Sequence, residues 1–401
     1  MHDQPALILT ALMILLFGLF SRQTERYPIT GPMVFVLAGA LLGPLGLNLF
    51  EPHLENGHAK IVAEITLIVI LFTDASMIHF RQLIALLAGL PARLLLIGLP
   101  LTVLLGALLA SWLFPDMALA WILLLALVLA PTDAALGQAV MMSPQIPERV
   151  RESLGIESGL NDGMVLPPIL MTLAIISEGG QLPDGMLHWL AFTLEQLTWG
   201  PIIGGLIGYF GGRLVDTASA AGWMEGAFQR LSSLSIALLA YAAAEQLNGN
   251  GFIAAFFAGL LLGAKTPVVR ERIEEFAEAE GQMLSLFVFL IFGLVLVPFM
   301  VAHIDATAVL YALLSLTVIR VLPVFIATLG SGHDWSQVAF IGWFGPRGIA
   351  SVLYLFLIVG TLGVEGHEYV YSIIILTVLI SIFVHGASAV PLSRLLNRST
   401  R

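Results

Sequence analysis

Two acidic dipeptides lie inside otherwise apolar stretches of helix length. Thr132-Asp133 follows Pro131 within residues 117–141, and Asn161-Asp162 lies within residues 153–177. An ionised carboxylate at the centre of a bilayer costs about 2.5–3.5 kcal/mol on insertion scales, so such residues normally line an ion or proton path. The two carboxylates therefore predict a membrane protein that moves ions or protons.

Asp162 has the chemistry of an exchange site. A carboxylate in a dehydrated pocket can be neutralised by a proton or by a small hard cation, but hardly by both, so that competition for Asp162 is exchange. Alkali cations prefer oxygen ligands, which here are the carboxylate of Asp162, the hydroxyl of Ser158 and the hydroxyl or carbonyl of Thr132. Ser158 and Asp162 are four residues apart and share a helix face. We expect these three residues to hold the transported alkali cation.

The neighbours of these residues bear on proton stoichiometry. Asn161 cannot titrate, which favours one proton for one monovalent cation. Asp133 has two open roles: direct contact with the ion, or binding of backbone amides freed by a break in its own helix. Glu157 precedes Asp162 by five residues and is rotated from it by about 140° on a helix. Glu157 therefore lies outside the expected ion shell and needs another partner.

The composition predicts a membrane protein along the whole length, residues 1–401. Apolar residues make up 58% and charged residues 11%, and the mean hydropathy is +0.95, far from the values of a soluble chain. Thirteen mostly apolar windows are each long enough to cross a hydrocarbon core of about 30 Å. They span residues 5–20, 30–50, 59–79, 91–113, 117–141, 153–177, 187–212, 231–247, 250–264, 281–302, 306–329, 336–361 and 369–391. We expect an all-α polytopic membrane protein without a soluble domain.

The distribution of basic residues supports this count of helices. Of the 17 Lys and Arg residues, 14 fall in the connections after helices 1, 3, 5, 7 and 9 or in the carboxyl tail. Lys and Arg gather on the cytoplasmic side of a membrane. The pattern predicts a protein of the cell inner (cytoplasmic) membrane with its amino terminus outside and its carboxyl terminus in the cytoplasm.

Two of the predicted helices are interrupted. The fifth is broken at Pro131 and the twelfth at the segment Gly342-Trp343-Phe344-Gly345-Pro346-Arg347-Gly348. Irregular backbone at membrane depth survives only where it faces protein or a wet cavity. If residues 5–177 and 231–391 form inverted repeats joined by a linking helix at 187–212, the two breaks occupy matching positions and point to a transport site. The alternative is that Pro131 and Pro346 are ordinary kinks.

The chain resembles the cation:proton antiporters of the prokaryotic and eukaryotic Na+/H+ exchanger type. The residues that carry the resemblance are Pro131-Thr132-Asp133, Glu157-Ser158-Gly159-Leu160-Asn161-Asp162, Arg320 and Gly345-Pro346-Arg347-Gly348. The resemblance implies an inverted-repeat fold in which discontinuous helices 5 and 12 cross, a homodimer, and electroneutral exchange of Na+ or Li+ for H+ by alternating access. K+/H+ exchange on the same fold is the alternative. Regulation through a long cytoplasmic tail is not expected.

Several other charged residues have expected roles. The resemblance implies that Glu157 and Arg320 pair between helices as a structural ion pair, although Arg320 could instead snorkel to a membrane surface. The geometry of the two repeats suggests that Arg347 places positive charge at the second break, where it balances carbonyl ends or Asp133. Asp74 is either a cytoplasmic funnel residue that attracts cations or part of a solvated helix end.

Other functional classes fit the sequence less well. The absence of cysteine excludes disulfides and thiolate sites, and no basic run suggests nucleic acid. No HExxH or GxSxG pattern indicates an enzyme, and no cofactor is expected. A channel or an organic-anion symporter should carry more polar groups in its membrane helices. We therefore expect monovalent cations, protons and the bilayer to be the partners of the chain.

Histidines and glycines complete the set of notable residues. His79, His303, His333, His367 and His385 titrate in the physiological range, but four of them lie near predicted membrane interfaces, which argues against a sensor role for any one. The glycines of Gly204-Gly205, Gly208 and Gly211-Gly212 suit close helix packing, for which the dimer contact is one candidate place.

Overall fold

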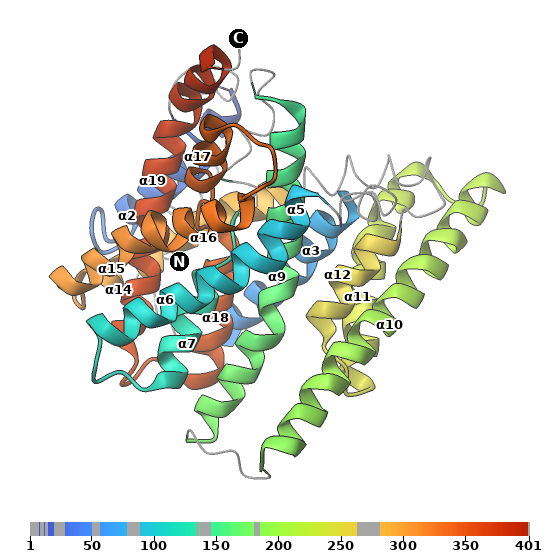
Figure 1. Cartoon of the computed structure of the whole chain (residues 1–401). Helices are drawn as coiled ribbons and strands as arrows, with labels where there is room; N and C mark the ends of the chain where they lie inside the picture. Colours follow the sequence, from blue (N-terminus) through green and yellow to red (C-terminus); the bar gives the residue numbers. More distant parts are fainter. Residues whose placement is uncertain are drawn as a thin grey trace. The chain divides into compact units, whose positions relative to one another are not determined.

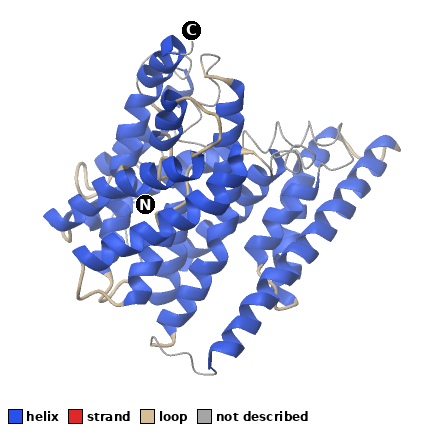
Figure 2. Cartoon of the chain, viewed as in Figure 1, coloured by secondary structure: helices blue, strands red, loops and turns tan. Residues whose placement is uncertain are grey.

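The chain is helical throughout the part that the structure describes. A computed structural model describes residues 8, 12, 15–19, 29–49, 57–77, 89–133, 136, 146–179, 185–262 and 281–399, and its regular elements are all helices (Figure 2). Six of the described helices are long and apolar enough to cross a membrane. Most of the predicted first helix, His79 and the second half of the interrupted fifth helix lie outside the described residues. The expectation of an all-α polytopic membrane protein is confirmed.

The chain divides into two compact units. The first unit comprises Met1–Lys60, Leu96–Gly155 and Ser285–Arg401, and the second comprises Ile61–Leu95 and Ile156–Leu284. Each unit takes segments from both predicted inverted repeats. The units group segments that contact one another in space, whereas the repeats are defined by the order of the helices along the chain. The division into repeats stays a prediction.

The first unit holds both interrupted helices. Its helices are α2 (Gly31–Leu42), α6 (Leu99–Leu113), α7 (Leu119–Val128), α14 (Val297–Val301), α15 (Ala306–Leu316), α16 (Val318–Thr328), α17 (Trp335–Trp343), α18 (Ile349–Leu362) and α19 (Glu368–Ser399). Residues 349–359 of α18 are all buried, and α18 packs against α7 and α19. A mostly apolar helix that is buried on all sides is typical of the interior of a membrane bundle. The core of the unit therefore forms around the second broken helix.

The second unit is built on close helix contacts. Its helices are α3 (Gly57–Met77) from residue 61, α5 (Leu90–Arg93), α9 (Glu148–Ser177) from residue 156, α10 (Gly185–Ala220), α11 (Gly226–Gln246) and α12 (Gly251–Leu262). Helices α10, α11 and α12 lie side by side (Figure 1). A Cβ added at Gly204 or Gly208 would overlap the backbone carbonyl oxygen of Ala254 or Ala258. The small residues of α10 thus bring the two backbones into contact, as expected for membrane helices.

The same contacts correct one expectation about the dimer. Gly212 faces the carbonyl oxygen of Leu262, and Gly211 faces the side chain of Ile236 on α11. These glycines are covered by helices of their own chain, so they are not available for a contact between two copies. Glycine content alone does not distinguish a contact within a chain from one between chains.

Three irregularities were not predicted. The π-helical turns η1 (Leu94–Gly98) and η2 (Phe292–Leu296) each precede a helix with proline in its first turn, Pro100 in α6 and Pro298 in α14. Proline lacks an N–H group, so the preceding turn loses a hydrogen bond and can widen. The predicted span 306–329 is confirmed as one segment of membrane length, Ala306–Thr328, with a local irregularity at Thr317 (φ −115°, ψ −90°) that separates α15 from α16.

Candidate functional site

The first break leaves backbone groups at a buried helix end without their helical hydrogen-bond partners. Helix α7 ends at Val128, and Pro131, Thr132 and Asp133 follow in non-helical backbone. The side chains of Thr132 and Asp133 are 2% and 4% exposed. Proline cannot continue the hydrogen-bond ladder of the helix, which explains why the helix stops here.

The second break lies in the same unit and meets the first. Five non-helical residues separate the end of α17 from the start of α18. The N–H of Asp133 donates to the carbonyl of Pro346 at 2.9 Å, and the carboxylate of Asp133 accepts from the N–H of Ile349 and, at 3.2 Å, from that of Leu136. In return, the Ser351 hydroxyl donates to the carbonyl of Val128 at 2.7 Å. The two breaks satisfy each other's backbone groups, and we call this contact between them the crossing. The predicted meeting of the two interrupted segments is confirmed for the described residues.

Two glycines of the second break are required by close approach. A Cβ at Gly348 would overlap the carboxylate of Asp133, and a Cβ at Gly345 would overlap the guanidinium of Arg320. The motif Gly345-Pro346-Arg347-Gly348 therefore leaves room for one carboxylate and one guanidinium. This explains the glycine at each end of the motif.

Arg347 is fully buried within the second break. Its side chain is 0% exposed, and Nη1 donates to the carbonyl of Gly345 at 2.9 Å. Its backbone N–H donates to the hydroxyl of Ser381 on α19 at 2.7 Å. Arg347 thus balances a carbonyl freed by the break, the first of its two predicted roles. The second role, balance of Asp133, stays a prediction.

Asp162 lies on an unbroken part of α9 in the second unit. Asp162 is 6% exposed, and Ser158, Asn161 and Glu157 are also buried. Because α9 is continuous from Glu148 to Ser177, Ser158 lies one turn before Asp162 on the same face, as predicted. Beside Asp162, a Cβ at Gly163 would lie 3.2–3.3 Å from the ring of Phe256 on α12. Glycine therefore lets α12 pack closely next to the carboxylate.

The remaining site expectations divide between the units. Thr132 and Asp133 belong to the first unit and Asp162 to the second, so the meeting of these groups at one ion stays a prediction. Arg320 is buried against Gly345 in the first unit, and its pairing with Glu157 of the second unit also stays a prediction.

Asp74 lies in the last described turns of α3, where its side chain is partly exposed. Its neighbour Phe72 offers a backbone carbonyl that packs directly against Gly259 of α12. The funnel role of Asp74 and its alternative, a solvated helix end, both remain open.

Sequence reasoning missed three residues that hold the crossing in place. Ser351 and Ser381 donate to or accept from backbone groups of the breaks. His385 lies within hydrogen-bond distance of the carbonyl of Trp343, at 3.0 Å. Polar residues four apart in the apolar stretch 369–391 were a signal that could have identified Ser381 and His385.

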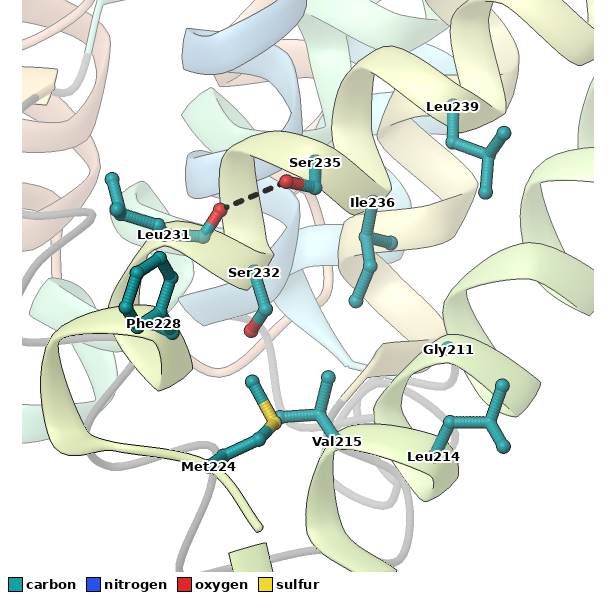
Figure 3. A pocket seen from close by; sticks show the side chains of 10 residues that line it. All are labelled: Gly211, Leu214, Val215, Met224, Phe228, Leu231, Ser232, Ser235, Ile236 and Leu239. Carbon is teal, nitrogen blue, oxygen red and sulfur yellow. Dashed lines mark hydrogen bonds between the residues drawn. The ribbon is translucent and has the colours of Figure 1, made fainter. Parts of the chain in front are cut away.

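Two cavities lie in the second unit. The larger, of about 390 Å³, is a groove between α10 and α11 whose lining is apolar apart from two hydroxyls (Figure 3). One of them, on Ser235, donates to the carbonyl of Leu231 at 3.2 Å. The groove offers no carboxylate and is not a candidate ion site. The smaller, of about 260 Å³, combines apolar residues of α9 with Gln196, Tyr241 and Glu245.

Comparisons with known proteins agree with this geometry. The family profile described as "Sodium/hydrogen exchanger, transmembrane" matches residues 8–395. The chain has 28% identity over 370 residues, 90% of its length, to the K(+)/H(+) antiporter NhaP of Alkalimonas amylolytica, and 28% over 399 residues, 97% of its length, to the K(+)/H(+) antiporter NhaP2 of Shewanella oneidensis. It spans 62% and 66% of these two relatives.

A yeast relative and a solved structure extend the comparison. The Na(+)/H(+) antiporter of Schizosaccharomyces pombe is 25% identical over 427 residues, which cover 96% of this chain and 88% of the relative. The fold is similar to that of the sodium proton antiporter MjNhaP1 from Methanocaldococcus jannaschii, with a TM-score of 0.79, 20% identity, and coverage of 99% of this chain and 100% of that one. The chain belongs to the sodium/hydrogen exchanger family.

Proposed function

We propose that this chain exchanges Na+ or Li+ for H+ across the membrane by alternating access, with the cation and the proton competing for Asp162. The observation that carries the proposal is a carboxylate 6% exposed in the middle of a membrane helix, with the hydroxyl of Ser158 one turn away. Membership of a family of transporters supports it. A buried acid of this kind marks an ion or proton path.

The competition at Asp162 supplies the coupling. When protonated, the carboxyl is neutral and no longer attracts a cation, so the cation is carried in one half of each transport cycle and the proton in the other half, in the opposite direction. Oxygen ligands from Asp162, Ser158 and Thr132 would hold the partly dehydrated cation as transported substrate. Alternating access then moves either bound species, but not the empty charged site, across the bilayer.

The contacts between the two breaks bear on the roles of Asp133 and Arg347. Helix α18 begins at the crossing, and the partial positive charge of its N-terminus interacts with the carboxylate of Asp133. Helix α7 ends there, and the carbonyl of Val128 accepts from the hydroxyl of Ser351. On these contacts we assign Asp133 a supporting role, with Arg347 as the counter-charge of the second break.

The transported ion has one serious alternative. The two bacterial relatives are named K(+)/H(+) antiporters, whereas the yeast relative is named a Na(+)/H(+) antiporter. K+/H+ exchange is therefore our second candidate. It uses the same carboxylate and differs only in the size of the cation that the oxygen ligands fit.

We further propose a homodimer in the inner membrane with the amino terminus outside. The asymmetry of loop charges supports the orientation. The exposed apolar face of α10, with Leu206, Phe210 and Leu214, is open to lipid or to a second copy.

Everted membrane vesicles test the exchange. A proton gradient is built in vesicles from a host without its own antiporters, Na+, Li+ or K+ is added separately, and a pH dye is recorded. We expect cation-dependent collapse of the gradient in the wild type, none with Asp162→Asn, and normal exchange with Asp116→Asn, which makes the same change at an exposed position. Equal exchange by the Asp162→Asn variant would sink the proposal.

The stoichiometry has its own test. One non-titrating Asn161 beside Asp162 supports one proton for one cation. We expect that a membrane potential imposed with an ionophore leaves the exchange rate of the wild type unchanged. In Asn161→Asp, which adds a second carboxylate, the rate should become sensitive to the potential. A wild-type rate that follows the potential contradicts electroneutral exchange.

A further inference from the structure

His385 and Ser381 occupy a gap in the hydrogen-bond ladder of the second broken helix. In an unbroken helix the N–H of Arg347 would donate to the carbonyl of Trp343, four residues earlier. The structure separates these two groups, because α17 ends at Trp343 and α18 begins only at Ile349. Both groups are instead met by side chains of α19, which belongs to the same unit.

The contacts form a chain of hydrogen bonds. His385 Nε2 lies 3.0 Å from the carbonyl oxygen of Trp343, and His385 Nδ1 lies 3.1 Å from the hydroxyl of Ser381. The same hydroxyl accepts from the N–H of Arg347 at 2.7 Å. His385 is 1% exposed and Ser381 is 0% exposed, so water does not compete for these bonds.

The carbonyl of Trp343 fixes one of the two ring hydrogens of His385. This carbonyl can only accept, so His385 Nε2 must carry a hydrogen. His385 Nδ1 lies 3.1 Å from both the hydroxyl and the backbone carbonyl oxygen of Ser381. A neutral imidazole accepts from the hydroxyl at Nδ1, whereas a protonated Nδ1 would donate to the carbonyl. In both cases the imidazole donates to the carbonyl of Trp343 and is anchored on Ser381.

We propose that His385 is a positioning residue which, through Ser381, replaces the missing hydrogen bond between Trp343 and Arg347 and holds the second break open for transport. The break so held presents Pro346 to the N–H of Asp133 and Ile349 to its carboxylate. The inference rests on the proposed exchange function, because it assigns His385 to the machinery of that site.

Two amide substitutions separate the two hydrogen bonds. Glutamine places an N–H donor near the position of Nε2 and does not titrate, whereas the shorter asparagine reaches only as far as Nδ1. In vesicle exchange at about pH 8, we expect His385→Gln to retain wild-type KM and most of Vmax, and His385→Asn to lose Vmax at least about tenfold, as befits a buried carbonyl left without a donor. His303→Gln, at an exposed position, is the matched control.

The paired variants provide the readout that a merely structural role of the imidazole would not give. Both variants remove the imidazole, but only glutamine restores a donor to the carbonyl of Trp343. Equal Vmax for the Gln and Asn variants overturns the proposal. If the Asn variant fails to fold, a loss of Vmax of about tenfold or more in folded His385→Gln protein overturns it as well. Absence of exchange in the wild type would instead refute the proposed function.

Discussion

At the scale of residues, the two buried aspartates are held in different ways. The carboxylate of Asp133 accepts from backbone amides, among them the N–H of Ile349 at the start of α18. Asp162 lies within a continuous helix whose interior amides are used by the helix itself. The charge of Asp133 is therefore balanced by the fold, whereas that of Asp162 must be balanced by other groups. This difference favours Asp162 as the group that a cation and a proton share.

Gly348 tests the fit around Asp133. Gly348→Ala would place a methyl group where the carboxylate of Asp133 lies, and over-packing of this kind typically costs about 1–3 kcal/mol. We expect lower thermal stability in detergent and loss of exchange in vesicles. Gly226→Ala is the control, because no atom lies within 4 Å of its added methyl group and the variant should behave as wild type. An unaltered Gly348→Ala protein would contradict the described crossing.

At the scale of elements, each broken helix supplies hydrogen-bond partners for backbone groups that the break in the other helix leaves without helical partners. Ser351 of α18 binds the carbonyl of Val128 at the end of α7, and Asp133 binds both the carbonyl of Pro346 and the N–H of Ile349. A membrane interior offers no water to satisfy these groups. Each break therefore supplies part of the hydrogen bonding that the other needs.

The start of α15 depends on an acidic cap. The carboxylate of Asp305 accepts from the N–H of Ala308 at 2.8 Å and from the hydroxyl of Tyr369 at 2.8 Å. The hydrogen bond from Ala308 lowers the pKa of Asp305 below its ordinary value. Because the pKa of Asp305 is lower in the folded protein than in the unfolded chain, its ionised carboxylate stabilises the fold. This contribution is complete above the pKa of about 3.9 in the unfolded chain and is lost as pH falls through the pKa in the folded protein.

Substitution of this cap should therefore have a pH-dependent effect. We expect Asp305→Ala to lower the free energy of unfolding by about 1 kcal/mol at neutral pH, with a smaller difference from wild type below about pH 4. Thermal unfolding in detergent across pH measures it. Asp334→Ala is the control, since Asp334 precedes α17 without a side-chain cap bond. A difference that grows toward acid would contradict this account.

The contact between α10 and α12 is a second test at this scale. Gly208→Ala would push a methyl group into the backbone carbonyl of Ala258, which cannot move without separating the helices. We expect a loss of about 1–3 kcal/mol of stability. Gly211→Ala meets only the flexible side chain of Ile236, at 3.2 Å, and should be close to neutral. Thermal stability in detergent compares the two, and equal losses would argue against the described contact.

At the scale of the whole molecule, hydropathy and charge determine how the chain lies in the membrane. Basic residues collect on one side of the predicted topology, with 14 of 17 on the side assigned to the cytoplasm. This asymmetry depends on the number of helices between charged connections. A change of one helix in the middle of the chain would reverse the orientation of everything after it.

Single cysteines test the orientation directly, because the chain has no cysteine of its own. We expect Asp116→Cys, in the connection before α7, to react with a membrane-impermeant maleimide on intact cells. Ala221→Cys, after α10, should react only in everted vesicles. Both positions are exposed in the structure. Labelling of both from one side would overturn the predicted topology.

The sequence by itself determined the features that depend on local composition. Apolar length predicted the helices, Pro131 and the 342–348 segment predicted the breaks, and the isolated carboxylates Asp133 and Asp162 predicted the site. These follow from the cost of charge and of unpaired backbone in lipid, which acts on each segment separately. Local reasoning correctly predicted close packing at the glycines of α10, but it could not tell that α11 and α12 of the same chain cover them, because distant segments decide this contact.

Only the tertiary structure decided which groups satisfy the breaks. The hydroxyl of Ser351 reaches Val128 across 223 residues of sequence, and His385 reaches Trp343 across 42. A buried donor or acceptor must find a partner, but any polar side chain that the fold brings near can serve. The sequence therefore predicts that backbone groups at Pro131 and at the 342–348 segment need hydrogen-bond partners, whereas the packing of the helices decides which residues are those partners.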